Sequence, residues 1–141
     1  MNREEAIKLL ALIKVAYPTA YKDMDTASKQ ATVNMWHTTF PQVPYPIMEM
    51  AFNRFRMVSK FPPTVADMCE ELKSLYWKST GDALAAASIG DTDNLKLCEF
   101  IMEHTNQYRS NEYINSPVYS GMKALAGRVG IGQLTEGNRY D

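Results

Sequence analysis

Prolines limit how far any single helix of this chain can extend. The seven prolines of the sequence are Pro18, Pro41, Pro44, Pro46, Pro62, Pro63 and Pro117. Proline lacks a backbone donor and disfavours a helical residue before it, so a helix must end before a proline or begin near one. Between these positions apolar residues recur three or four apart, which is the spacing of one helix face. No stretch alternates apolar and polar residues as a strand does, and we predict an all-α fold.

Start signals place three helices in the first third of the chain. The first is expected over residues 3–16, with Asn2 and Glu5 forming a capping box. The second follows the polar residues 23–26, and the third opens at Pro46, a residue suited to a first helical turn. Their expected apolar faces are Ile7, Leu10, Ile13 and Tyr17 in the first, Val33, Trp36 and Phe40 in the second, and Ile47, Ala51, Phe55 and Val58 in the third.

The segment Phe-Pro-Pro-Thr-Val-Ala-Asp at residues 61–67 carries the fourth start signal. Thr64 is placed as an N-cap, and Asp67 lies three residues on, where its carboxylate can reach back. We expect Phe61 to pack on Met68 as a hydrophobic staple. The fourth helix is then expected to run to about Lys78. Together the four helices form a small bundle over residues 1–78.

The rest of the chain is expected to hold a C-terminal pair of helices. Residues 79–91 are small and bounded by glycines, which predicts a linker or a short helix. A segment over residues 92–131 follows, with one helix to about Tyr108 and a last helix that starts at Ser116-Pro117. Residues 132–141 have little to bury, and a flexible tail is expected there.

Charge and composition exclude some classes of protein. Lys plus Arg number 15 and Asp plus Glu number 16, so the net charge of −1 argues against coating nucleic acid by bulk charge. Residues 1–80 carry ten basic and eight acidic residues and residues 81–141 five and eight, net charges of +2 and −3. Cys69 and Cys98 are too far apart to suggest a disulfide scaffold or a metal site, and we expect both to be reduced and buried.

Neither a signal peptide nor a membrane span is expected, because no basic start with an apolar core and no long apolar run occurs. We therefore expect a cytoplasmic protein of a host bacterial cell. The chain also has nine methionines. Five of them lie in the first module, where we expect them to fill its core: Met35, Met48, Met50, Met57 and Met68.

No residue pattern predicts an enzyme. The glycines of residues 127–132 follow a helical pattern, whereas a nucleotide loop must precede a helix. His37 and His104 are isolated, and the pair Glu70–Glu71 is explained by the helix dipole. We expect no catalytic residues, no metal site and no cofactor.

Nucleic-acid binding has one candidate segment. Arg54, Arg56 and Lys60 lie close to Phe52, Phe55 and Phe61 in the sequence. The two arginines lie about 200° apart on a helix, so they do not share a face. The aromatic residues fit a core better than a stacking platform. A solvated face over a core is favoured, and DNA contact is kept as an alternative.

The second part of the chain carries the residues expected to bind a partner protein. Val118, Met122, Leu125 and Val129 have the spacing of an amphipathic helix that can enter a groove. The same stripe also fits closure of the chain's own core. Tyrosine and arginine are favoured at protein interfaces. The expected partner-binding residues are Tyr108, Arg109, Met122, Leu125 and Arg128.

Several segments together resemble a known family. They are Asn2–Lys14, Ala16–Pro18, Tyr21–Met24, Val33–Trp36 and Lys60–Asp67. They are similar to the N-terminal domain of replicative-helicase loader/inhibitor proteins from phages and prophages of Gram-positive bacteria. The resemblance covers about residues 1–75.

The resemblance implies a small helical, non-enzymatic protein of DNA replication. Such a protein binds a DnaB-type helicase hexamer, loads it or inhibits it, and works with an origin-binding replication protein. In the family the C-terminal part grips the helicase. Two other functions stay open: a DNA-binding replication-initiation or regulatory module, and a phage protein that blocks a host or defence protein.

Overall fold

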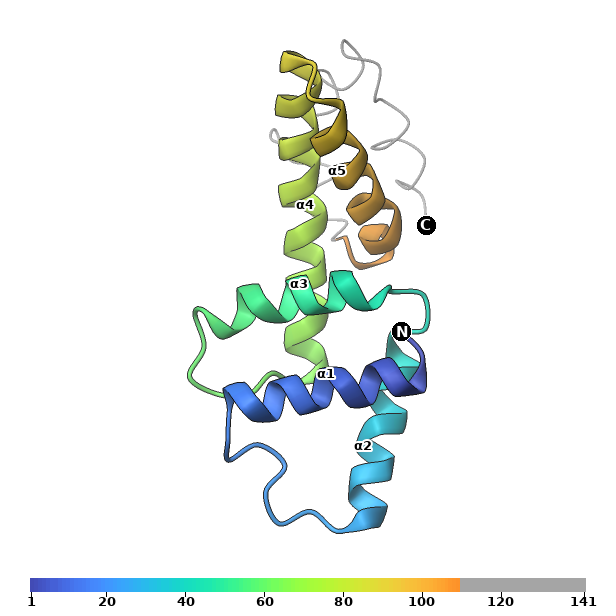
Figure 1. Ribbon diagram of the computed structural model, residues 1–141, viewed down its shortest axis with the longest axis vertical. Helices are drawn as coiled ribbons and strands as arrows, with labels where there is room; N and C mark the ends of the chain where they lie inside the picture. Colours follow the sequence, from blue (N-terminus) through green and yellow to red (C-terminus); the bar gives the residue numbers. More distant parts are fainter. Residues whose placement is uncertain (110–141) are drawn as a thin grey trace. The chain divides into compact units, whose positions relative to one another are not determined.

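A computed structural model describes residues 1–109 of the chain, and all regular structure in this range is helical. The elements are α1 (Arg3–Ala16), α2 (Thr26–Thr39), α3 (Tyr45–Arg56), α4 (Val65–Ile89), α5 (Thr92–Thr105) and the 3₁₀ turn η1 (Asn106–Tyr108) (Figure 1). The prediction of an all-α fold is confirmed. The helix predicted over residues 117–129 lies outside the described residues.

Both predicted capping boxes are present. At α1 the Glu5 amide donates to Asn2 Oδ1 at 2.8 Å, and the Asn2 amide donates to Glu5 Oε1 at 2.8 Å. At α4 the Asp67 amide donates to Thr64 Oγ1 at 3.1 Å, and the Thr64 amide donates to Asp67 Oδ2 at 2.9 Å. Each box satisfies amides that the first helical turn leaves without partners.

Two other helices begin at a single aspartate. Asp25 Oδ1 accepts the Ser28 amide at 2.7 Å at the start of α2. Asp91 Oδ1 accepts the Asn94 amide at 3.2 Å at the start of α5. The hydrogen bonds from Ser28 hold the pKa of Asp25 below its ordinary value, because they favour the charged carboxylate. The sequence offered several caps for α2 within residues 23–26, and the structure selects Asp25.

The contacts divide the chain into two compact units, Met1–Glu71 and Leu72–Asp141. The first unit contains α1, α2, α3 and the first turns of α4. The second contains the rest of α4 together with α5 and η1. The domain over residues 1–78 and the segment over residues 92–131 stay predictions, because residues 110–131 lie outside the described range.

In the first unit α1 and α3 lie side by side and run in the same direction (Figure 1). At their starts the Met1 amino group donates to the Val43 carbonyl at 2.7 Å and to the Phe40 carbonyl at 3.1 Å. At their ends the Tyr17 hydroxyl donates to the Ser59 carbonyl at 2.8 Å. The parallel pair is therefore fastened to backbone carbonyls at both ends.

The core of the first unit differs from the predicted faces at two positions. Ile7 is 48% exposed and Val58 is 82% exposed. Ile7 lies at the margin of the α1 face that is buried, and Val58 lies beyond the end of α3 at Arg56. The fully or almost fully buried residues of this unit include Ala6, Leu9, Leu10, Ile13, Trp36, Phe40, Val43, Ile47, Met48, Ala51, Phe52 and Met68.

The predicted packing of Phe61 on Met68 is wrong. Phe61 is 77% exposed, whereas Met68 is fully buried. The cap is Thr64, so the staple position directly before it is occupied by Pro63, and Pro63 is buried. Phe61 lies two residues further out, and its side chain is left on the surface.

The fourth helix is longer than predicted. The sequence indicates an end near Lys78, but α4 continues to Ile89. Alanine has the highest helix propensity of any residue type, and the alanines within residues 83–87 favour a helix that continues past Gly81. Gly90, with a φ of +75°, ends it in the left-handed conformation that glycine adopts without strain.

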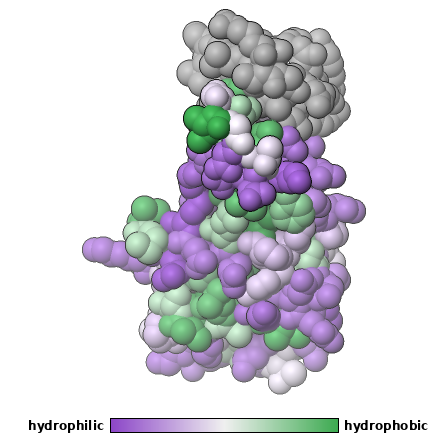
Figure 2. Space-filling model, turned by 45° about the horizontal axis from the view of Figure 1, so that its top comes forward, coloured by the Kyte–Doolittle hydropathy of each residue, from purple (hydrophilic) through white to green (hydrophobic). Residues whose placement is uncertain are grey.

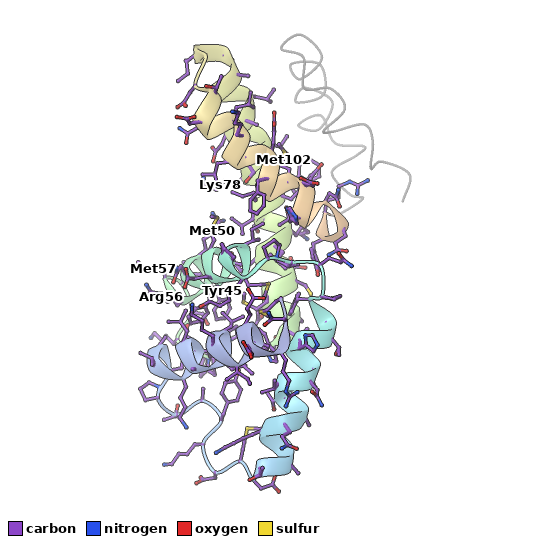
Figure 3. The ribbon with its side chains drawn as sticks, turned by 45° about the vertical axis from the view of Figure 1, so that its right-hand side comes forward. Tyr45, Met50, Arg56, Met57, Lys78 and Met102 are labelled. Carbon is purple, nitrogen blue, oxygen red and sulfur yellow. The ribbon has the colours of Figure 1, made fainter. Side chains whose placement is uncertain are left out.

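In the second unit α4 and α5 pack through a small apolar cluster. Tyr76, Ala83, Cys98 and Met102 are its buried members. The Thr80 hydroxyl donates to the Tyr76 carbonyl at 3.0 Å and contacts Met102 Sδ at 3.2 Å. Figure 3 shows Met102 on α5 beside α4.

The hydrogen bond between Tyr17 and Ser59 is tested by Tyr17→Phe. Removal of the hydroxyl leaves the Ser59 carbonyl without this donor, and we expect the free energy of unfolding to fall by about 1 kcal/mol. Urea denaturation followed by circular dichroism measures this change. The control is Tyr21→Phe, since the pKa of Tyr21 is raised by burial alone. Equal losses in the two variants would contradict the fastening role.

The continuity of α4 is tested by replacing its two glycines. A Cβ at Gly81 or at Gly90 meets no atom within 4 Å. We expect Gly81→Ala to raise the free energy of unfolding by about 1 kcal/mol, because alanine favours a helix interior. Gly90→Ala is expected to lower it by about 1 kcal/mol, because the left-handed backbone strains alanine. If residues 79–90 were a flexible linker, neither substitution would change stability in thermal denaturation.

Candidate functional site

The structure describes two of the five predicted partner-binding residues. Tyr108 lies in η1 and is half-buried, and Arg109 follows it directly. Arg109 Nη1 donates to the Asn106 carbonyl at 3.1 Å, which closes the end of the turn. Met122, Leu125 and Arg128 lie outside the described residues. The grouping of the five therefore stays a prediction.

An exposed apolar patch, which the sequence did not predict, follows the end of α3. It consists of Met57, Val58 and Phe61, and we call it the α3-end patch. Met57 is 75% exposed, and the other two are at least as exposed. Figure 3 shows Met57 and Arg56 together at this end of α3. Large apolar side chains gathered on a surface mark sites of protein–protein interaction.

Three cations lie close in sequence to the α3-end patch. Arg54 Nε forms an ion pair with Glu71 Oε2 at 3.4 Å, and Arg56 Nε donates to Asn53 Oδ1 at 3.0 Å. Lys60 is exposed. The two arginines are thus engaged by neighbouring side chains of the same unit.

The aromatic residues near these cations do not form a stacking platform. Phe52 is fully buried and Phe55 is half-buried. Phe61 alone of the three presents most of its ring to solvent. A single exposed ring beside one exposed lysine favours contact with protein over contact with a nucleic-acid strand.

A shallow hollow on α3 adjoins the patch. Met50, Arg54 and Met57 line it together with Pro46, Glu49 and Asn53. Met57 belongs to both features, so the hollow and the α3-end patch are continuous. Figure 3 shows Met50 on the opposite side of α3 from Tyr45, which lies between α3 and α1. On the face shown in Figure 2, apolar side chains reach the surface in separate areas between hydrophilic ones.

The methionines of the first unit are divided between core and surface. Met48 and Met68 are fully buried, as predicted. Met57 is exposed, Met35 is 57% exposed and Met50 is half-buried. The prediction that these methionines fill the core is therefore wrong for Met35 and Met57. Helical spacing identifies a face, but it does not say whether a second helix covers it.

The titratable side chains lie apart from one another. His37 Nδ1 lies 3.1 Å from the Met1 carbonyl, and His104 Nδ1 lies 2.9 Å from the Phe100 carbonyl. Cys98 is buried and Cys69 half-buried, and burial is the main cause that raises the pKa of both thiols. Both cysteines are free, as expected. A neutral thiol is a poor nucleophile, so neither cysteine is poised for covalent chemistry.

Within residues 1–109, no group of three or more histidine, cysteine or acidic side chains has a geometry that could hold a metal ion. None of the helices in this range combines the length and the apolar character of a membrane span.

Comparison with known proteins gives one match. Residues 1–69 match the family model for the N-terminal domain of the phage protein gp39P, a helicase loader/inhibitor. No curated protein and no solved structure matched the chain. The matched segment contains α1, α2, α3, the α3-end patch and the capping box that opens α4. Residues 1–69 of this chain therefore belong to the gp39P N-terminal domain family of phage helicase loader/inhibitor proteins, as the sequence resemblance predicted.

Proposed function

We propose that this chain is a replication accessory protein of a phage or prophage that binds a DnaB-type replicative helicase hexamer. Through this contact it loads the helicase, inhibits it, or does both. The protein acts by binding, which favours one state of the helicase over another. The observation that carries the proposal is the match of residues 1–69 to the gp39P N-terminal domain.

The surface of the first unit is compatible with such a role. Met57, Val58 and Phe61 leave a large apolar area in water, and covering it on a partner is favourable by about 25 cal/mol for each Å² buried. The arginines near it are held by Glu71 and Asn53. The surface is therefore a better fit to a protein partner than to DNA.

The function is tested by mixing the full chain with a purified DnaB-type helicase at micromolar concentrations. We expect the two proteins to elute together in gel filtration and the rate of ATP hydrolysis by the helicase to change. The same mixture without ATP reports whether binding depends on the nucleotide state. Absence of both co-elution and any change in ATPase rate would contradict the proposal.

A control measurement separates helicase binding from DNA binding. Anisotropy of labelled duplex DNA is recorded with the full chain alone over a series of salt concentrations. We expect no tight binding. A steep fall in affinity with salt, in the absence of helicase, would instead support the DNA-binding alternative, because phosphate contacts release counterions.

The α3-end patch is tested by the double variant Met57→Ser, Phe61→Ser. Both side chains are exposed, so the free energy of unfolding is expected to stay within about 0.5 kcal/mol of the original. Affinity for the helicase is expected to fall about tenfold, because the patch is covered on binding. Isothermal titration calorimetry compares the affinities of the variant and the original chain. The control is Met35→Ser, which removes an exposed methionine from α2.

The comparison variant Met122→Ser, Leu125→Ser places the predicted C-terminal site in the same assay. A loss of helicase affinity in this variant, with the α3-end variant unchanged, assigns the contact to the second part of the chain. A loss in both assigns it to both parts. An unchanged affinity in both variants would contradict both assignments while leaving the helicase interaction intact.

A further inference from the structure

A groove between α1 and α2 is distinct from the α3-end patch and shares no residue with it. Its volume is about 310 Å³, at the lower end of the range for ligand pockets. α1 contributes Ile7, Leu10 and Lys14, which recur at helical spacing along one wall, and α2 contributes Lys29 and Val33 from the other. The groove lies entirely within the first unit.

The floor of the groove is apolar and partly open to water. Leu10 is buried beneath it, and Val33 and Met24 are half-buried. Ile7 has nearly half of its surface exposed, although the sequence assigns it to the core. Apolar side chains in a concave site gain more from being covered than those on a convex surface, because they can be contacted from several sides.

One side of the groove is formed by the connection between α1 and α2. Tyr21 and Met24 line it. The backbone of Tyr21 has a φ of +58° and that of Asp23 a φ of +64°, both in the left-handed region that disfavours residues other than glycine. The surrounding structure must hold these conformations against their cost. The shape of this side is therefore set before any partner arrives.

The charged side chains that line the groove are both lysines. Lys14 and Lys29 are exposed, and they stand on opposite walls. Neither forms an ion pair with an acidic residue in the described part of the chain. Each remains available to a carboxylate outside the unit.

We propose that this groove binds an acidic amphipathic helix of a partner protein. Ile7 and Lys14 are separated by two helical turns, about 10 Å, which matches apolar anchors at i, i+3 or i+4, and i+7 on a docked helix. Carboxylates on both flanks of those anchors meet Lys14 and Lys29. A DNA duplex would leave the apolar floor uncovered and would find only two cations among the residues that line the groove.

The proposal does not depend on the helicase function, since any protein of the required chemistry can supply the helix. Its test uses a labelled synthetic peptide of about four helical turns, with leucines along one face and glutamates on both flanks. A second peptide carries lysines in place of the glutamates, and a third carries serines in place of the leucines. Fluorescence anisotropy measures the binding of each to the full chain.

We expect saturable binding of the acidic peptide and much weaker binding of the other two. The variant Lys14→Glu, Lys29→Glu is expected to weaken the binding of the acidic peptide at least tenfold and to improve that of the lysine peptide, because the charge complementarity is reversed. The control is Lys60→Glu, which changes an exposed lysine of the same unit outside the groove. Circular dichroism checks that all variants remain folded.

Three results would overturn the proposal. Equal affinity for the acidic and the lysine peptide would exclude a role for the two rim lysines. An equal loss in Lys60→Glu would show that only the net charge of the chain matters. Self-association of the full chain in sedimentation, abolished by Lys14→Glu, Lys29→Glu, would make a second copy of the chain the occupant instead.

Discussion

The first unit depends on fastening two parallel helices at both ends. α1 and α3 run in the same direction, so no short loop can join them, and the chain must return along its own length before α3 begins. α2 and its two connections make that return. The Met1 amino group then ties the two starts through the Phe40 and Val43 carbonyls, and the Tyr17 hydroxyl ties the two ends through the Ser59 carbonyl. The apolar core lies between these ties.

The return path also explains where the unit exposes functional surface. α1 pairs with α2 over one side and with α3 over another, and the connection between α1 and α2 passes through two left-handed residues, Tyr21 and Asp23. The groove lies where this connection meets the two helices. The α3-end patch lies where α3 stops and the chain turns toward α4. Both surfaces are therefore consequences of how the chain connects its helices.

Helix starts were predictable from the sequence, whereas the exposed sites were not. The capping box of Thr64 with Asp67 needs a spacing of only three residues, and the family resemblance was carried by such local segments. The end of α4 was harder to predict, because alanine propensity and a single glycine act in opposite directions. Ile7 and Val58 continue apolar stripes, and only the positions of distant helices leave them uncovered. The predicted contacts within residues 118–129 fall outside the described residues, so they rest on spacing alone.

The two ties between α1 and α3 also bear on how the first unit forms. They join residues 39 to 42 positions apart in the chain, so neither can be made by local winding of a helix. The entropy of closing so long a loop must be overcome before either contact contributes, which slows folding compared with a bundle of antiparallel neighbours. During synthesis the second tie cannot form until Ser59 has left the ribosome. The unit is therefore expected to assemble late and in a single cooperative step.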